Sequence, residues 1–131
     1  MKAKPVVLVV DDNAMIQTLS VDFLESLGLA AETASSAAEA RNMLAALGGK
    51  FDGVILDIGL PDTRGDVLLG ELRDLYPDLP IIIATGTHHG DIRQAISGRG
   101  AVVYLGKPYR IDNMRSALIE AGIIGSERAE P

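Results

Sequence analysis

Hydrophobic positions along this chain follow two patterns, short continuous runs and longer stripes with helical spacing. Continuous apolar runs are typical of strands buried on both faces of a parallel sheet. Such runs predict strands at 6–10, 51–57 (with the run at 54–56), 81–85 and 101–105, and 29–33 is a weaker strand near a sheet edge. Between and after the runs, apolar residues recur every three or four positions, which predicts amphipathic helices. Five β-α units in strict alternation therefore predict one α/β domain with helices on both faces of a parallel sheet.

The helical stripes predict which residues face the core. The predicted stripes are Ile16, Leu19, Phe23 and Leu27 in the first helix; Ala40, Met43, Leu44 and Leu47 in the second; Leu68, Leu72 and Leu75 in the third; Ile92, Ala95 and Ile96 in the fourth; and Ile111, Met114, Leu118 and Ala121 in the last. Met15, like Met43 and Met114, is assigned to packing rather than to a functional surface.

Polar residues mark the starts of several helices. Asp11-Asp12-Asn13 offers capping side chains to the first helix. Ser36 and Glu39 match a capping box at the second helix, and Asp112 is the expected cap of the last. Gly28 suits the C-terminal end of the first helix.

Composition narrows the class of protein. The 131 residues, 47% of them apolar, fit one globular domain at 1–125 followed by a polar tail at 126–131. A net charge of −6 argues against direct nucleic-acid binding, which needs a basic face. The absence of cysteine excludes disulfides and thiolate metal sites. No apolar stretch reaches the roughly 20 residues that cross a bilayer, and 6–10 is too short for a signal peptide, so we expect a cytoplasmic protein with no membrane partner.

Polar side chains gather where the predicted strands end. Asp11 and Asp12 follow the first strand, Asp57 ends the third, Thr85 ends the fourth and Lys107 lies just past the fifth. Sites in open parallel sheets form outside the C-terminal ends of the strands. If the first and third strands are neighbours, three carboxylates share one crevice with a hydroxyl and an ammonium group.

Three carboxylates this close repel one another unless a cation joins them. An all-oxygen cluster is what Mg²⁺ prefers, and the ion can then hold a phosphate oxygen. Taken singly, each residue has a simpler interpretation: Asp11-Asp12 as a helix cap, Asp57 as a turn former, Thr85 as a strand end, Lys107 as a solvated lysine. The ordered set of all four outweighs these single interpretations.

The chain resembles the receiver domain of response regulators in two-component signalling, the CheY-like family. Four motifs carry the resemblance, which covers Val6 to Ala121: Leu8-Val9-Val10-Asp11-Asp12, Ile55-Leu56-Asp57-Ile58-Gly59-Leu60-Pro61 with Gly65, Ile83-Ala84-Thr85-Gly86, and Tyr104-Leu105-Gly106-Lys107-Pro108. It implies a flavodoxin-like three-layer α/β/α sandwich with five parallel strands in the order 2-1-3-4-5, and it makes 1–125 a receiver domain.

The resemblance assigns roles to the matching positions. Asp57 would accept a phosphoryl group from a phosphohistidine. Asp12 would bind Mg²⁺ directly and Asp11 mainly through water, with Asp57 and the main-chain carbonyl of Gly59 as further ligands and Mn²⁺ as a substitute ion. Lys107 would contact the phosphoryl group.

Further roles concern switching and partners. Thr85 would move to hydrogen-bond the phosphoryl group and Tyr104 would turn inward, changing a surface formed by the fourth helix, fifth strand and fifth helix. A cis peptide bond would join Lys107 and Pro108. The implied partners are a histidine kinase or histidine phosphotransfer protein, and a downstream protein target on that surface. The implied protein is a phosphoacceptor that assists its own phosphorylation and dephosphorylation, not an enzyme.

Other functions are compatible with parts of the pattern. An aspartyl-phosphate phosphohydrolase of the haloacid-dehalogenase type also uses a strand-end Asp and Mg²⁺, but its Asp-x-Asp motif is missing because Asp57 is followed by Ile58-Gly59. A flavodoxin-like cofactor carrier would need a phosphate-binding loop where Asp11-Asp12-Asn13 stands. A docking module without phosphorylation would not need the complete residue set. The chain would be either a stand-alone receiver or a receiver excised from a hybrid histidine kinase or a longer regulator.

Overall fold

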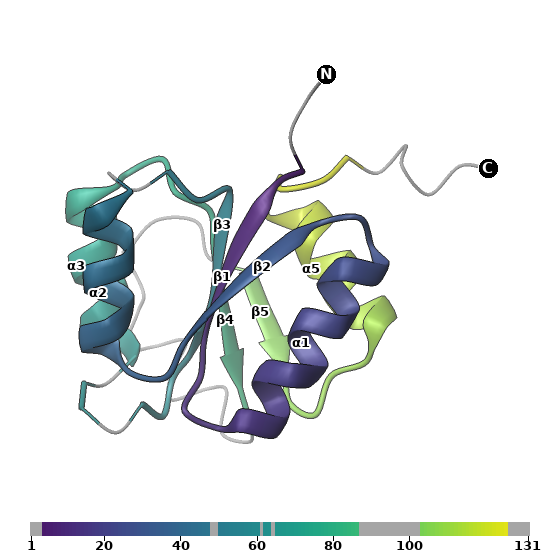
Figure 1. The fold of residues 1–131 in the computed structure, drawn as a ribbon, viewed down its shortest axis with the longest axis horizontal. Helices are drawn as coiled ribbons and strands as arrows, with labels where there is room; N and C mark the ends of the chain where they lie inside the picture. Colours follow the sequence, from purple (N-terminus) through teal and green to yellow (C-terminus); the bar gives the residue numbers. More distant parts are fainter. Residues whose placement is uncertain (1–3, 48–49, 61, 64, 87–102, 126–131) are drawn as a thin grey trace.

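The computed structural model describes residues 4–47, 50–60, 62–63, 65–86 and 103–125 (Figure 1). Its elements follow in the order β1 (Val6–Val10), α1 (Ala14–Ser26), β2 (Ala30–Ala34), α2 (Ala37–Ala46), β3 (Gly53–Asp57), α3 (Gly65–Leu75), β4 (Ile81–Thr85), β5 (Val103–Gly106) and α5 (Ile111–Glu120). The predicted fourth helix, with Ile92, Ala95 and Ile96, and the polar tail lie outside the described residues. Within the described chain, no helix is long and apolar enough to cross a bilayer.

The five strands form one parallel sheet in the order β2-β1-β3-β4-β5. Helices α2 and α3 cover one face, and α1 and α5 cover the other (Figure 1). This confirms the predicted three-layer sandwich and its strand order. The strand boundaries differ slightly from the prediction, since β2 begins one residue later and Phe51 and Asp52 precede β3.

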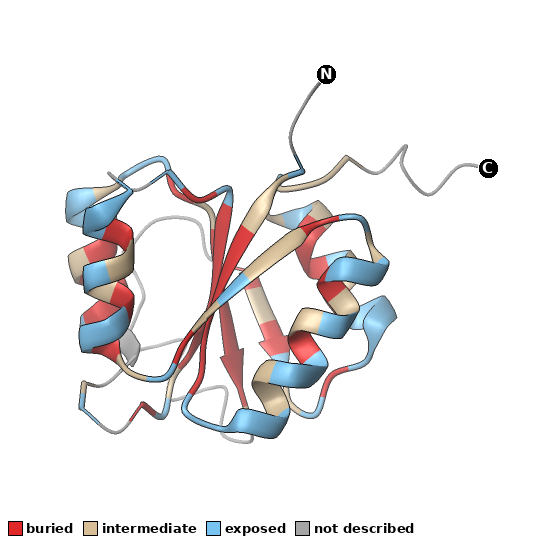
Figure 2. Ribbon diagram, in the orientation of Figure 1, coloured by how far each residue is buried: buried red, intermediate tan, exposed pale blue. Residues whose placement is uncertain are grey.

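Alternation along the strands divides the core into two layers. Leu8 and Val10 of β1 join the apolar cluster beneath α2 and α3, whereas Val7 and Val9 join the cluster beneath α1 and α5. Successive strand side chains point to opposite faces, so a continuous apolar run can serve both layers. Figure 2 shows the buried residues concentrated along the central strands and the inner faces of the helices.

The predicted helix stripes are correct at their centres and wrong at several ends. Leu44, Leu68, Leu72, Met114 and Leu118 are buried as predicted. The exposed exceptions are Met15, Leu19, Leu47, Leu75 and Ile111. All but Leu19 lie in a terminal turn or cap of a helix, and helical spacing alone does not show where a helix end extends past the sheet.

The prediction for α1 contains the largest error. Met15 was assigned to the core but is 81% exposed, and Leu19 is also exposed. The fully buried residues of α1 are Ser20 and Leu24, which directly follow Leu19 and Phe23 of the predicted stripe. Ile16, Phe23 and Leu27 of the predicted stripe are partly buried and pack against the cluster beneath α1 and α5. Within the stripe, the error therefore concerns Leu19, whose place in the buried face is taken by Ser20 and Leu24. A prediction based on hydrophobicity does not identify a buried serine, because serine is polar.

The helix ends confirm some caps and correct others. Asn13 Oδ1 accepts a hydrogen bond from the Ile16 amide at 3.1 Å. Ser36 Oγ accepts from the Glu39 amide at 3.1 Å, but the Glu39 carboxylate accepts from Ser35 rather than from Ser36.

At α5 the predicted capping residue is wrong. Asp112 lies within the first turn, whereas the cap residue is Arg110. The Arg110 amide donates to Asn113 Oδ1 at 2.9 Å. Asp112 therefore lies two residues inside the position it was assigned.

Candidate functional site

The sheet register brings the predicted polar residues to one edge. Asp57, the last residue of β3, is paired with Ala84 of β4, and Thr85 is paired with Gly106, the last residue of β5. Asp11 directly follows β1, which is the neighbour of β3. Lys107 directly follows β5, and its amide donates to the Thr85 carbonyl at 2.7 Å. Residues from four strands thus meet at the C-terminal edge of the sheet.

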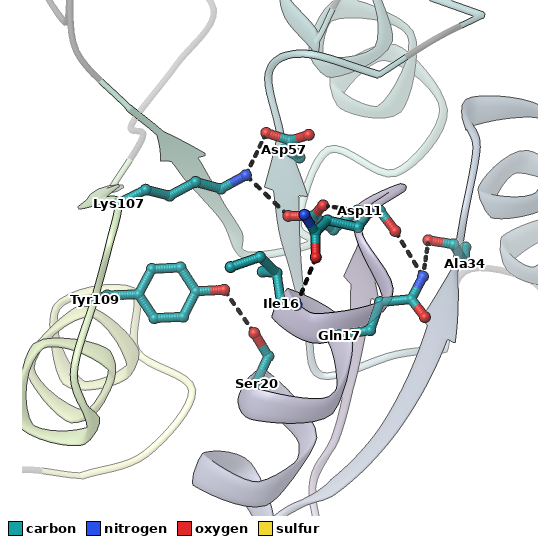
Figure 3. A network of polar contacts seen from close by, with 9 residues as sticks. Asp11, Ile16, Gln17, Ser20, Ala34, Asp57, Lys107 and Tyr109 are labelled. Carbon is teal, nitrogen blue, oxygen red and sulfur yellow. Dashed lines mark hydrogen bonds and ion pairs between the residues drawn. The ribbon is translucent and has the colours of Figure 1, made fainter.

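Lys107 joins two carboxylates from different strands. Its Nζ donates to Asp57 Oδ1 at 2.8 Å and to Asp11 Oδ2 at 2.9 Å (Figure 3). Asp11 and Asp57 are only 2% and 7% exposed. Buried charges need partners of opposite sign, and Lys107 supplies one positive charge for both carboxylates.

The electrostatics of Lys107 reflect this position. Burial, the largest single influence, lowers the pKa of the ammonium group. The hydrogen bonds and charges of Asp57 and Asp11 outweigh burial, so the net pKa lies above the ordinary value of a lysine. Lys107 is therefore positively charged across the physiological pH range.

Three carboxylate groups lie close together at this edge of the sheet. Asp11, Asp12 and Asp57 each offer an oxygen, and these oxygens lie within 4.8 Å of one another. Asp12 is exposed, which opens the group to solvent. A Cβ placed on Gly59 would lie 4.0 Å from Asp57 Oδ2, so the Gly59 backbone is close to the same group. The set contains only oxygen donors and has excess negative charge, which fits Mg²⁺.

Thr85 and Tyr104 occupy different positions relative to this group. Thr85 is 3% exposed and lies at the same edge of the sheet as Asp57. Tyr104 pairs with Ile83 further back along β5. It is partly buried and packs against the cluster beneath α2 and α3. The peptide bond between Lys107 and Pro108 is cis, as predicted.

Several residues around the site were missed by sequence reasoning. Gln17 Nε2 donates to the Asp11 carbonyl at 2.6 Å and to the Ala34 carbonyl at 3.4 Å (Figure 3). It also donates to Ser35 Oγ at 3.1 Å. It therefore links the ends of β1 and β2. Nothing in the sequence distinguishes Gln17 from an exposed helix residue, because its role depends on the path of β2.

Two buried hydroxyl groups, one from α1 and one from the segment that follows Lys107, form a pair beside the site. Ser20 of α1 and Tyr109, two residues beyond Lys107, share a hydrogen bond (Figure 3). Burial raises the pKa of the Tyr109 phenol, and the hydrogen bond with Ser20 opposes that effect. The pair connects α1 to the segment that carries the lysine.

Comparisons with known proteins agree with this geometry. Residues 7–119 match the family described as response regulator receiver domain. The chain is 37% identical over 117 residues to the C4-dicarboxylate transport transcriptional regulatory protein DctD of Rhizobium meliloti, covering 87% of this chain and 24% of the relative. It is 29% identical over 114 residues to the sensor kinase CckA of Brucella abortus, covering 87% of this chain and 12% of the relative.

A solved structure shows the same fold. A response regulator receiver domain protein from Clostridium thermocellum is 30% identical, with a TM-score of 0.82, and the match covers 89% of this chain and 93% of that one. The chain therefore belongs to the response regulator receiver domain family, the CheY-like phosphoacceptor domains of two-component signalling. The comparisons do not favour the phosphohydrolase. The chain spans about a quarter or less of the length of the two curated relatives described.

Proposed function

We propose that Asp57 is the residue that accepts the phosphoryl group. One observation carries the proposal: Asp57 is buried at a strand end, bonded to Lys107, and grouped with Asp11 and Asp12. A phosphoacceptor carboxylate needs neighbours that neutralise incoming charge, and this arrangement provides them.

The transfer requires positioning more than covalent assistance. An Asp57 oxygen attacks the phosphorus of a phosphohistidine. A P–O bond forms as the P–N bond breaks, and the imidazole leaves with the bonding electrons. Lys107, already 2.8 Å from Asp57 Oδ1, is close enough to move from the carboxylate to a phosphoryl oxygen.

The acidic group and Gly59 complete the site. Asp11, Asp12, Asp57 and the main-chain carbonyl of Gly59 would hold Mg²⁺, with Mn²⁺ as a substitute. When bound, the ion supplies positive charge opposite the transferring phosphoryl group. Exposed Asp12 leaves this side of the site open to a donor protein.

Phosphorylation would then alter a binding surface. The product carries about two negative charges where one carboxylate stood. Thr85 would hydrogen-bond the phosphoryl group and Tyr104 would turn inward, changing a surface that includes β5 and α5. Thr85→Ala should leave phosphorylation largely intact and reduce the accompanying chemical-shift changes in β5 and α5; unchanged shifts would contradict this role.

The partners follow from the chemistry. The donor would be a histidine kinase or a histidine phosphotransfer protein, and the reader of the modified surface a second protein. The chain would act in the cytoplasm as a phosphoacceptor that promotes its own phosphorylation and dephosphorylation, without turnover of another substrate.

Intact mass after incubation with acetyl phosphate and Mg²⁺ tests the proposal. The wild-type chain should gain one phosphoryl group, and the gain should disappear with a chelator or with Asp57→Asn. An equal gain in Asp57→Asn would contradict the assignment. If no adduct accumulates, beryllofluoride binding decides: an unphosphorylated docking module would not bind it in a manner that depends on Asp57.

A further inference from the structure

The segment between β3 and α3 carries Gly59 and is held at several points. The Ile58 amide donates to the Ala84 carbonyl at 3.3 Å, which fixes the segment at the sheet. Leu60 is buried in the cluster beneath α2 and α3. Gly59 lies between these two points and is itself exposed. A third attachment lies at Asp62, three residues after Gly59.

Asp62 contacts the first turn of α2. Its Oδ1 accepts a hydrogen bond from the Ala37 amide at 2.9 Å, and its Oδ2 accepts from the Ala38 amide at 3.0 Å. The first amides of a helix have no partner within the helix. Ser36 satisfies the Glu39 amide, so Asp62 supplies the two acceptors that the capping serine does not. These hydrogen bonds lower the pKa of the Asp62 carboxyl group.

The next residue makes a second link to the same helix. Arg41 Nη2 of α2 donates to Thr63 Oγ1 at 3.3 Å. The same guanidinium group makes two hydrogen bonds with the carboxylate of Glu71 on α3, at 2.6 and 3.0 Å. Helix α2 therefore contacts two consecutive residues of the segment and also the helix that follows it.

We propose that Asp62 is a positioning residue for the metal site: by attaching the segment to α2, it holds the Gly59 carbonyl where Mg²⁺ needs it. This inference rests on the proposed function, in which Mg²⁺ binds the acidic group and Gly59. Only two residues separate Gly59 from Asp62, so a displacement of Asp62 is transmitted over a short chain. Because this segment is already ordered in the folded protein, binding of the ion does not carry the entropic cost of ordering it.

A matched control separates positioning from ordinary helix capping. Ser36 caps the same turn of α2, but its hydroxyl accepts a hydrogen bond from the Glu39 amide within that helix, whereas Asp62 reaches α2 from the segment after β3. Ser36→Ala and Asp62→Ala should both lower the melting temperature, because each leaves an amide of α2 without its acceptor. Only Asp62→Ala should also change the affinity for the metal ion.

The experiment measures Mg²⁺ affinity by calorimetry for the wild type, Asp62→Ala, Asp62→Asn and Ser36→Ala, with melting temperatures in parallel. We expect Asp62→Ala to raise the Kd by about tenfold, the lower end of the range for groups that orient metal ligands. Asp62→Asn keeps one acceptor and should recover part of the affinity. Ser36→Ala should stay within about twofold of wild type, well below that range.

Four outcomes would overturn the inference. If Asp62→Ala and Ser36→Ala change the Kd equally, Asp62 is only a cap. If Asp62→Asn and Asp62→Ala are equal and their effect disappears at high salt, the carboxylate acts through charge alone. If the wild type binds no Mg²⁺, the metal part of the proposed function fails together with this inference, whereas normal binding by both wild type and Asp62→Ala removes this inference alone.

Discussion

Lys107 is the residue on which the charge balance of the site depends. Within the described residues, its ammonium group forms ion pairs with both Asp11 and Asp57. Removing one partner from a buried ion pair leaves the other charge without compensation. The lysine should therefore contribute to folding as well as to phosphoryl transfer.

Lys107→Met tests this folding role. In metal-free buffer we expect the free energy of unfolding to fall by about 1–3 kcal/mol, the range for hydrogen bonds to charged groups and for unsatisfied buried groups. The loss should be smaller in an Asp57→Asn background, because one of the two carboxylates is then neutral. Urea unfolding of the four variants measures the coupling. Equal losses in both backgrounds would show that Lys107 does not stabilise Asp57.

At the scale of elements, α1 is connected to the lysine segment by its buried serine. Ser20 is fully buried and bonds the hydroxyl of Tyr109, which is 4% exposed. A buried hydroxyl that loses its partner keeps the full cost of desolvation. This contact joins a helix near the start of the chain to the segment between β5 and α5.

Ser20→Ala should destabilise the protein by about 1–3 kcal/mol, because the Tyr109 hydroxyl is left buried without a partner. Adding Tyr109→Phe should restore part of that loss, since the unsatisfied group is then removed. Thermal or urea unfolding of the single and double variants tests this. A double variant that loses the full sum of the two single effects would contradict the account.

The strands and helices also show which features of the fold could be predicted from the sequence. Apolar runs located four strands, and β2 was predicted from a weaker signal. The strand ends located Asp11, Asp57, Thr85 and Lys107, because a parallel sheet places those ends together. The faces of the helices were predicted less well. The α1 prediction included Leu19 and missed Ser20, since a polar residue that hydrogen-bonds a distant tyrosine has no hydrophobic signature.

Contacts between segments far apart in the chain could not be predicted from the sequence. Asp62 follows a proline in the sequence, and its two amide partners lie 25 and 24 residues earlier in the chain. Such a contact exists only once α2 and the segment after β3 are placed side by side. The strand order itself came from family resemblance rather than from spacing.

At the scale of the whole molecule, the acidic group links metal binding to stability. Three carboxylates converge in a chain whose net charge is −6. An ion that binds the folded state stabilises it by an amount that grows with concentration, about 2.7 kcal/mol at one hundred times the Kd. Metal removal should therefore lower the stability of the whole domain.

We expect Mg²⁺ to raise the melting temperature of the wild type and to have much less effect on Asp12→Asn. Asp12 is exposed, so its replacement should leave the metal-free melting temperature unchanged or slightly higher as repulsion decreases. Asp74→Asn, at an exposed position of α3, is the matched control and should respond to Mg²⁺ like the wild type. An Asp12→Asn chain with the full Mg²⁺ response would contradict the assigned metal site.

The identity of the phosphorylated residue is the central claim, and chemical trapping tests it most directly. The chain would be phosphorylated with acetyl phosphate and Mg²⁺ and then treated with sodium borohydride, which reduces an aspartyl phosphate to homoserine. Peptide mass spectrometry then locates the reduced residue. The account predicts homoserine at position 57 and at no other aspartate. Homoserine at position 11 or 12 would contradict it, as would a phosphorylated chain with Asp57 unchanged.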